Sequence, residues 1–209
     1  MILAFDTCLD KTYIAFEKDN DIQYKRIESD EKNYHSAYLI STIKEMGFEP
    51  SAIKYLIVNC GPGSFTGIRA TLSVAKVMAQ ELNIPVVGLN SCEILLKAGS
   101  MENSAVLLDA RRSMYYFYEK NQIELILLEK VEEKIQNKTI ICDNNTFNTF
   151  LDKFSNKFIN YEKQNYPLEK VILELGKEKI NNSQNPNEEF SCEKLEANYI
   201  QTPPIFGKN

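Results

Sequence analysis

The sequence predicts an α/β protein made of two related lobes, each a mixed sheet flanked by helices. Strand and helix patterns alternate along the 209 residues, which is typical of this class. The opening pattern returns about 102 residues later, as an internal repeat would. A glycine-rich turn, Gly61–Arg69, joins a strand to a long helical pattern. We expect an N-terminal lobe over residues 1–103 and a smaller C-terminal lobe over residues 104–209, whose last segment is free to pack back on the first lobe.

The repeat lies in the strands that open each lobe. In the first lobe, an apolar strand ends at Asp6 and an aromatic strand ends at Glu17-Lys18 before a polar turn. In the second lobe, Asp109 ends an apolar strand and Glu119-Lys120 ends an aromatic one. The identities are few, so chance similarity is the alternative to a duplication.

The elements of the first lobe follow from its apolar runs and from the residues that punctuate them. Asp19-Asn20-Asp21 favours a tight hairpin turn, Gly47 stops a helix, and Asn90 or Ser91 caps one. We predict strands at residues 2–5, 12–16, 22–27, 56–58 and 86–89, and helices at residues 39–46, 66–82 and 91–98.

The second lobe has a less regular pattern. Its strands are predicted at residues 105–109, 115–118, 125–128 and 139–142, with a third strand of the repeat near Ile123, and its helices at residues 146–154 and 168–180. Residues 188–195 are helical or extended, residues 197–200 form a last short strand, and the tail 202–209 is irregular because it contains two prolines.

Composition and charge describe a soluble protein without the features of an autonomous nucleic-acid binder. The formal net charge is −5, from 24 basic and 29 acidic residues, whereas nucleic-acid binders carry basic patches. The five cysteines include no C-x-x-C pair, so reduced thiols are favoured over disulfides or a metal site. The start of the chain lacks the basic and apolar pattern of a signal peptide, and no apolar run is long enough to span a membrane, so we expect neither feature. We expect a cytoplasmic protein.

The stretch Gly61-Pro62-Gly63-Ser64-Phe65-Thr66-Gly67-Ile68-Arg69 has two interpretations. Glycines between a strand and a helix let several backbone N–H groups point at one anion, and Gly61, Gly63 and Ser64 would then contact a phosphate or nucleotide. Glycines also permit tight turns and close backbone packing. The stretch matches neither the Walker A loop nor the dinucleotide fingerprint. We favour a rigid corner that positions the following helix, with anion binding as the alternative.

The helix predicted at residues 66–82 is apolar over more of its circumference than one sheet can cover. Arg69, Ser73, Lys76 and Gln80 form a narrow polar stripe, and nearly all other positions are apolar or small. A helix on one sheet needs an apolar face of about 100°. We therefore expect either a second helix of this chain or a partner subunit to cover the excess.

Other polar residues have both a structural and a functional interpretation. Asp6 and Asp109 end strands before turns, where a carboxylate binds Mg²⁺ or orients water in phosphoryl transfer, or else caps the turn. Arg111-Arg112 is either solvated or a phosphate contact. His35 is the only histidine, so the chain cannot form a two-histidine metal site.

A series of motifs resembles the bacterial TsaB (YeaZ) family, in the order seen there and over roughly the first half of the chain. They are Ile2–Thr7, His35-Ser36, Asn59–Arg69, Ile84–Gly88 and Leu108–Arg112. The resemblance implies an actin/Hsp70/sugar-kinase-like (ASKHA) fold of two related lobes, in agreement with the repeat. The sequence departs from the family pattern at Ala37, Ser113-Met114 and Gln201. The resemblance therefore does not carry ligand contacts in the second lobe over to this chain.

The resemblance also implies a role in threonylcarbamoylation of the adenosine next to the anticodon in tRNAs that read ANN codons. There the family member is a non-catalytic scaffold and activator of a related subunit, TsaD, which carries the metal and the transfer chemistry. An ATPase subunit, TsaE, joins them. On this resemblance the chain has no cofactor of its own, with ATP, Mg²⁺ and metal in the partners, and it contacts tRNA only through the complex. The single histidine agrees, because the catalytic relatives need an H-x-x-x-H pair.

The partner is expected on two helices of the first lobe, at residues 35–46 and 67–82, and the same surface would form a homodimer when the chain is alone. The positions expected at the interface are His35, Leu39, Ile43, Met46, Phe65, Thr66, Arg69, Leu72, Ala75, Lys76 and Ala79. The alternative from another class is an autonomous ATP-dependent kinase or ATPase of the same fold that uses Asp6 and Asp109.

Overall fold

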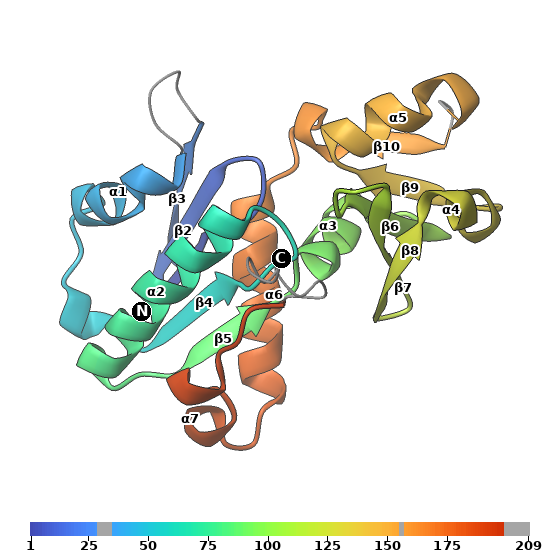
Figure 1. The fold of residues 1–209 in the computed structure, drawn as a ribbon. Coiled ribbons are helices and arrows are strands. Elements are labelled where there is room, and N and C mark those ends of the chain that lie inside the picture. Colours follow the sequence, from blue (N-terminus) through green and yellow to red (C-terminus); the bar gives the residue numbers. More distant parts are fainter. Residues whose placement is uncertain (29–34, 155–156, 199–209) are drawn as a thin grey trace, which may run out of the picture.

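The computed structural model describes residues 1–28, 35–154 and 157–198, which form two lobes, each built on a five-stranded sheet (Figure 1). In the first sheet the strand order is β3-β2-β1-β4-β5. Its strands are β1 (Ile2–Asp6), β2 (Thr12–Lys18), β3 (Asp21–Ile27), β4 (Tyr55–Asn59) and β5 (Val86–Leu89). The pairs β1–β2 and β2–β3 are antiparallel, whereas β1–β4 and β4–β5 are parallel.

The second sheet repeats this topology with the order β10-β9-β6-β7-β8. Its strands are β6 (Ser104–Asp109), β7 (Met114–Glu119), β8 (Gln122–Leu127), β9 (Thr139–Cys142) and β10 (Phe158–Asn160). The hairpins match as well, since Asp19-Asn20 and Lys120-Asn121 both adopt positive φ, as a two-residue turn of type I′ requires. The predicted ASKHA fold class, with two related lobes, is confirmed.

Helices cover both faces of the first sheet. On one face lie α1 (Leu39–Glu45), which continues the short helix η1 (His35–Tyr38), and α2 (Phe65–Leu82), and they enclose a core with Phe5, Phe16 and Leu56. On the other face lies α6 (Leu168–Asn182), whose residues Ile172 and Leu175 pack in a core with Ile57. In Figure 1, α2 and α6 lie on opposite sides of this sheet. Helix α6, which follows the second sheet in the sequence, thus completes the first lobe.

The second sheet is covered in the reciprocal way. Helices α4 (Leu128–Lys134) and α5 (Asn144–Phe154) enclose a core of their own with β6 to β10. The other face packs on α3 (Ser91–Gly99), which comes from the first half of the chain and contacts β6 and β9. The remaining elements are η2 (Pro50–Ala52), η3 (Tyr161–Lys163), α7 (Pro186–Glu189) and η4 (Cys192–Lys194).

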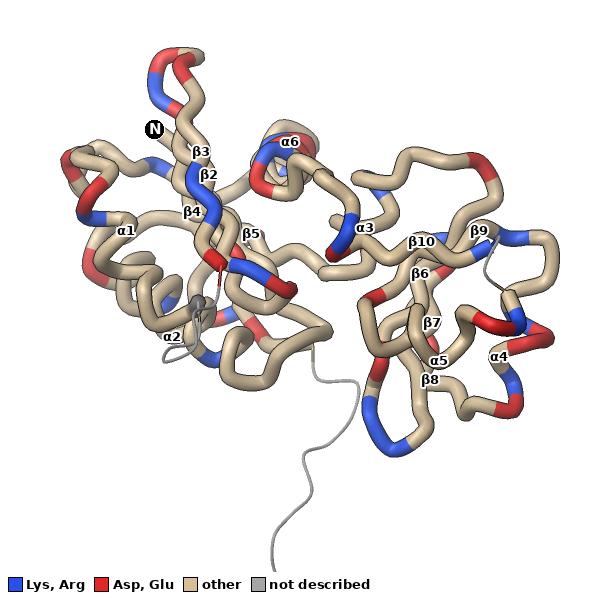
Figure 2. The backbone as a smooth tube through the Cα atoms, turned by 90° about the horizontal axis from the view of Figure 1, so that it is seen from above, with Lys and Arg blue, Asp and Glu red and all other residues tan. Residues whose placement is uncertain are grey.

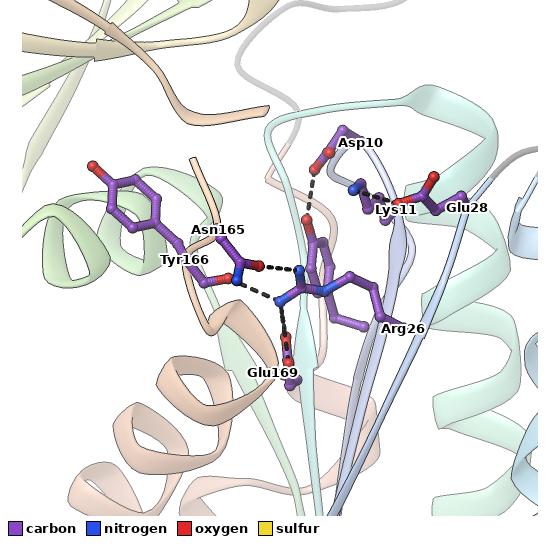
Figure 3. A network of polar contacts seen from close by, with 8 residues as sticks. Asp10, Lys11, Arg26, Glu28, Asn165, Tyr166 and Glu169 are labelled. Atoms are coloured by element: carbon purple, nitrogen blue, oxygen red, sulfur yellow. Dashed lines mark hydrogen bonds and ion pairs between the residues drawn. The ribbon is translucent and has the colours of Figure 1, made fainter. Parts of the chain in front are cut away.

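A polar network holds the start of α6 against the first sheet (Figure 3). The Arg26 guanidinium donates to Asn165 Oδ1 at 3.0 Å, to the Tyr166 carbonyl oxygen at 2.9 Å and to the Glu169 carboxylate at 3.0 Å. It also lies over the Tyr13 ring, 5.3 Å from its centroid. Arg26 therefore fixes the point where the chain returns from the second lobe to the first.

Most predicted elements occur within one or two residues of their expected bounds, and the differences lie in the second lobe. Leu128 begins helix α4 instead of ending a strand, and neither α4 nor β10 was predicted. Ala197 and Asn198 are not in a strand; residues 199 and 200 and the tail 202–209 lie outside the described residues. Basic and acidic residues alternate along the backbone of both lobes (Figure 2). Among the described helices, none is both long and apolar enough to span a membrane.

Candidate partner-binding surface

The glycine-rich stretch forms a tight corner between β4 and α2, wedged against the turn that follows β1. Gly61 has φ +93°, a conformation that favours glycine. A Cβ on Gly63 would overlap the Cys8 carbonyl oxygen, and one on Gly67 would lie 2.7 Å from the Thr7 carbonyl carbon. The Ser64 N–H donates to the Cys8 carbonyl oxygen at 2.8 Å. Gly63 and Gly67 allow two backbone segments to meet where side chains would keep them apart, and Gly61 supplies the positive φ of the turn.

The backbone donors of this corner are largely used inside the chain. The Gly61 N–H donates to Asn59 Oδ1 at 3.0 Å, and the Ser64 N–H is taken by Cys8. The Ser64 hydroxyl oxygen caps α2 by accepting from the Gly67 N–H at 3.2 Å. An anion that contacts Gly61 and Ser64 would have to displace these bonds, and Gly63 packs closely against the Cys8 backbone carbonyl. The corner is therefore better explained as a structural joint.

Asp6 and Asp109 both act as turn caps. Asp6 is fully buried and accepts from the Cys8 N–H at 2.6 Å and the Leu9 N–H at 3.4 Å. Desolvation raises the pKa of its carboxyl group from 3.8 to about 6, against those hydrogen bonds. Asp109 accepts from the Arg111 N–H at 2.7 Å and from Asn145 Nδ2 at 3.3 Å. Within the described residues, no group of three or more His, Cys, Asp or Glu side chains could hold a metal ion.

Helix α2 buries one stripe and presents the opposite one to solvent. The buried stripe holds Gly67, Ile68, Thr71, Ala75 and Ala79, which recur at helical spacing. At its centre, Thr71 Oγ1 lies 2.8 Å from Thr7 Oγ1 and accepts from the Thr7 N–H at 3.1 Å. The exposed stripe holds Phe65, Thr66, Arg69, Ser73, Val77 and Gln80.

Four of the expected interface residues are corrected by their burial. Leu39 and Ile43 of α1 and Ala75 and Ala79 of α2 pack in the first lobe's own core, between the helices and the sheet. Their side chains are therefore not available to a partner in this conformation. The apolar excess of α2 is partly covered by its own sheet and by the short helices η1 and η4.

The other expected residues lie at or near the outer face of these helices. Phe65, Thr66 and Arg69 are exposed, and the Arg69 guanidinium stacks over the Phe65 ring at 4.1 Å. Met46, Leu72 and Lys76 are half-buried at its rim. His35 is the first residue of η1, and its side chain lies outside what the structure describes.

Two exposed apolar residues were missing from the expected set. Ile40 on α1 and Val77 on α2 are 53% and 59% exposed, the largest values among the large hydrophobic side chains of the described residues. The sequence carried a signal for Val77, because it lies four residues after Ser73 and eight after Arg69, on the polar side of the helix. We call Ile40, Phe65, Thr66, Arg69, Ser73 and Val77 the α1/α2 face.

A groove borders this face where the end of the described chain passes along α2. Its volume is about 450 Å³, and its lining includes Arg69, Ser73 and Lys76 from α2 and Leu195 and Glu196 from the C-terminal segment. That segment is fixed by backbone hydrogen bonds, from the Val86 N–H to the Phe190 carbonyl oxygen and from the Asn198 N–H to the Cys60 carbonyl oxygen.

Sequence relatives decide the family. Residues 33–145, more than half of the chain, match the family profile described as "TsaD: tRNA N6-adenosine threonylcarbamoyltransferase". A Bacillus subtilis protein named tRNA threonylcarbamoyladenosine biosynthesis protein TsaB is 31% identical over 121 residues, which are 55% of this chain and 52% of that protein. The chain belongs to the TsaB (YeaZ) family.

Two further comparisons extend the match to nearly the whole length. The protein of the same name from Buchnera aphidicola subsp. Acyrthosiphon pisum is 27% identical, over 96% of this chain and 97% of that protein. The solved structure of YeaZ from Pseudomonas aeruginosa has the same fold, with a TM-score of 0.70 and 18% identity over 95% of this chain and 99% of that one. The second lobe, where the motifs are weakest, is therefore a genuine part of the TsaB-family fold.

Proposed function

We propose that this TsaB-family chain is a non-catalytic, activating subunit in the synthesis of threonylcarbamoyladenosine in tRNA, and that it pairs with a TsaD-like catalytic paralogue. The names of its relatives support the pathway. The modified base would be the adenosine next to the anticodon of tRNAs that read ANN codons. A TsaE-like ATPase joins the pair, ATP, Mg²⁺ and metal belong to these partners, and tRNA meets this chain only within the complex.

The chemistry of the residues supports a non-catalytic role. One histidine cannot supply the paired metal ligands of the catalytic relatives. The carboxylates that an autonomous kinase would use, Asp6 and Asp109, are engaged in capping turns, and Asp6 has no exposed surface. We therefore do not propose an independent ATP-dependent activity.

The observation that carries the pairing proposal is the composition of the α1/α2 face. Ile40 and Val77 expose large apolar side chains on two neighbouring helices, and the small Ser73 lies on the same stripe as Val77. Small residues let a partner helix approach closely, and apolar anchors inside a polar rim are typical of stable interfaces. The stacked Phe65–Arg69 pair adds two side-chain types that are enriched at binding hot spots.

The test is binding to the TsaD-like paralogue from the same cell, by size exclusion and by isothermal titration. The two chains should form a stoichiometric heterodimer at micromolar concentrations. Val77→Glu should weaken the pairing at least tenfold, because a charge would be buried at the contact. Ala75→Glu is unsuitable, since Ala75 lies in the core and its replacement would unfold the lobe.

Leu151→Glu is the matched control, because it places the same charge on an exposed leucine of α5 in the second lobe. It should leave the affinity unchanged. Separate elution of the two wild-type chains would refute the pairing, and unchanged affinity of a folded Val77→Glu variant would refute the surface. Loss of threonylcarbamoyladenosine from tRNA when the chain is depleted tests the pathway by itself.

A further inference from the structure

Strand β8 forms one edge of the second sheet. It pairs antiparallel with β7, and in the described part of the chain no strand pairs with its other side. An edge strand presents unpaired backbone N–H and C=O groups and can template another strand. The equivalent edge strand of the first sheet, β3, provides a comparison for what protects such a strand.

The hairpin geometry determines which residues of β8 face the open edge. Lys120-Asn121 form a two-residue turn, so its flanking pair, Glu119 and Gln122, exchanges hydrogen bonds. Hydrogen-bonded and non-hydrogen-bonded pairs alternate along an antiparallel ladder. Ile123, Leu125 and Leu127 therefore direct their N–H and C=O groups away from β7.

The side chains of this edge are apolar and solvent-exposed. Leu125, Leu127 and the adjoining Leu128 are 37%, 48% and 44% exposed. Helix α3, which packs on the same sheet, contacts β6 and β9 and ends at Gly99, whereas its counterpart α6 runs for 15 residues across the first sheet as far as β3. The shorter helix leaves the β8 side of the sheet uncovered.

The equivalent edge strand of the first sheet is protected. β3 carries Lys25 and Arg26, and charged side chains are a common means of blocking edge pairing. Arg26 also ties β3 to the start of α6. In β8 the single charged residue is Glu124, which forms an ion pair with Lys134 at 2.6 Å. Ile123, Leu125 and Leu127 point their side chains to the opposite face of the sheet from Glu124. Their outward N–H and C=O groups therefore have no charged side chain of β8 beside them.

We propose that β8 pairs antiparallel with β8 of a second copy of this chain, about a two-fold axis at Leu125, so that the two sheets become continuous. This register places Leu125 opposite its own copy and Ile123 opposite Leu127, all with outward backbone groups. Glu124 then lies opposite Ile126, so the two glutamates do not oppose each other. A register centred on Glu124 would place like charges in direct opposition and would use N–H groups already committed to β7.

Self-pairing of this kind is isologous, because the same strand serves both copies. Its contact area is that of one strand and the adjacent Leu128, which is small for a stable interface. The dimer is therefore weak. It does not depend on the proposed function, since β8 lies in the other lobe from the α1/α2 face.

The first experiment is sedimentation equilibrium of the full chain alone over a concentration series. The wild type should dimerise with increasing concentration, and Leu125→Lys should raise the Kd at least tenfold while the circular dichroism stays native. Leu151→Lys, the same change on an exposed leucine of α5, should leave the Kd unchanged. A wild-type chain that stays monomeric up to about 500 µM overturns the proposal. So does a dimer that Val77→Glu abolishes and Leu125→Lys retains, because its interface would be α2.

The second experiment tests the register by cross-linking. A hydrogen-bonded pair on the two-fold axis has Cα atoms about 5.5 Å apart, within the range of a disulfide. Leu125→Cys should form a covalent dimer under mild oxidation, whereas Leu151→Cys and the wild type, in which four of the five cysteines are buried, should not. Equal cross-linking of Leu125→Cys and Leu151→Cys would overturn the register.

Discussion

Replacing Gly67 by alanine should destabilise the protein, although Gly67 lies inside a helix. Intrinsic propensity alone predicts a gain of about 1 kcal/mol for this change. In the structure, however, the new Cβ would overlap the Thr7 carbonyl oxygen and lie 2.7 Å from its carbonyl carbon, and neither atom can rotate away. Relief requires that α2 move off the turn after β1.

The magnitude follows from the contacts that this movement would loosen. Overpacking of this kind costs about 1–3 kcal/mol. The bond from Thr7 Oγ1 to the Gly67 carbonyl oxygen at 2.7 Å and the bond from the Thr7 N–H to Thr71 would both lengthen, for about 1 kcal/mol each. After the gain of about 1 kcal/mol in helix propensity is subtracted from these costs, the free energy of unfolding should fall by about 2–4 kcal/mol. The midpoint of thermal unfolding should fall by about 6–12 °C.

The assay is urea unfolding together with a thermal melt, and Gly99→Ala is the matched control. At Gly99 the new Cβ would overlap Ile141 Cδ1, which belongs to a side chain with rotatable bonds. The control should therefore lose less than Gly67→Ala. If Gly67→Ala were as stable as the wild type or more so, helix propensity would dominate and the close seating of α2 on the β1–β2 turn would be incorrect.

Two further changes test the electrostatics of the first lobe. Burial raises the pKa of Asp6 to about 6, so the folded state binds this proton more tightly than the unfolded state; the free energy of unfolding should rise as the pH falls from about 7 to 4. Asp6→Asn should flatten part of that rise, measured by urea unfolding at several pH values, and an unchanged slope would contradict the assignment. Arg26→Ala should cost about 3 kcal/mol in the same measurement, because it leaves the mostly buried Glu169 without its cation. Lys97→Ala, which breaks an exposed ion pair with Glu178, should lower the free energy of unfolding by less than about 1 kcal/mol. Equal losses for Arg26→Ala and Lys97→Ala would show that the Arg26 network stabilises the fold no more than an exposed ion pair does.

The sequence predicted the elements well where local pattern decides them. Residues 86–89 and 139–142 were predicted as strands with their observed bounds, because apolar runs between turn residues leave few alternatives. Helix α4 was missed because Leu128 extends the apolar pattern of β8, so that a helix start looks like a longer strand. β10 has only three residues, too few for a periodicity to register.

The candidate site was less predictable, because it depends on which side of a helix meets the sheet. An apolar excess on α2 does not identify the inner stripe, since apolar residues occur on both sides, Val77 outside and Ala75 and Ala79 inside. The orientation is set by contacts between residues far apart in sequence: the close approach of Gly67 to Thr7 and the hydrogen bonds between Thr71 and Thr7. Nothing in the local sequence shows that Thr71 faces the sheet. Ala75 lies four residues after Thr71 on the same buried stripe, and it was therefore wrongly assigned to the outer face.

Helix α3 packs on the sheet of the second lobe and helix α6 on the sheet of the first. This arrangement limits how the chain can be cut into fragments and how it can fold during synthesis. Each sheet has one face that only a helix from the other half of the sequence covers. A fragment that ends at residue 103 would expose the apolar residues Ile57 and Val87, which pack with α6 in the full chain. Neither half should therefore be soluble when produced alone. During synthesis the first lobe cannot close until Asn182 has left the ribosome, so it needs protection from aggregation while the whole second sheet is being translated.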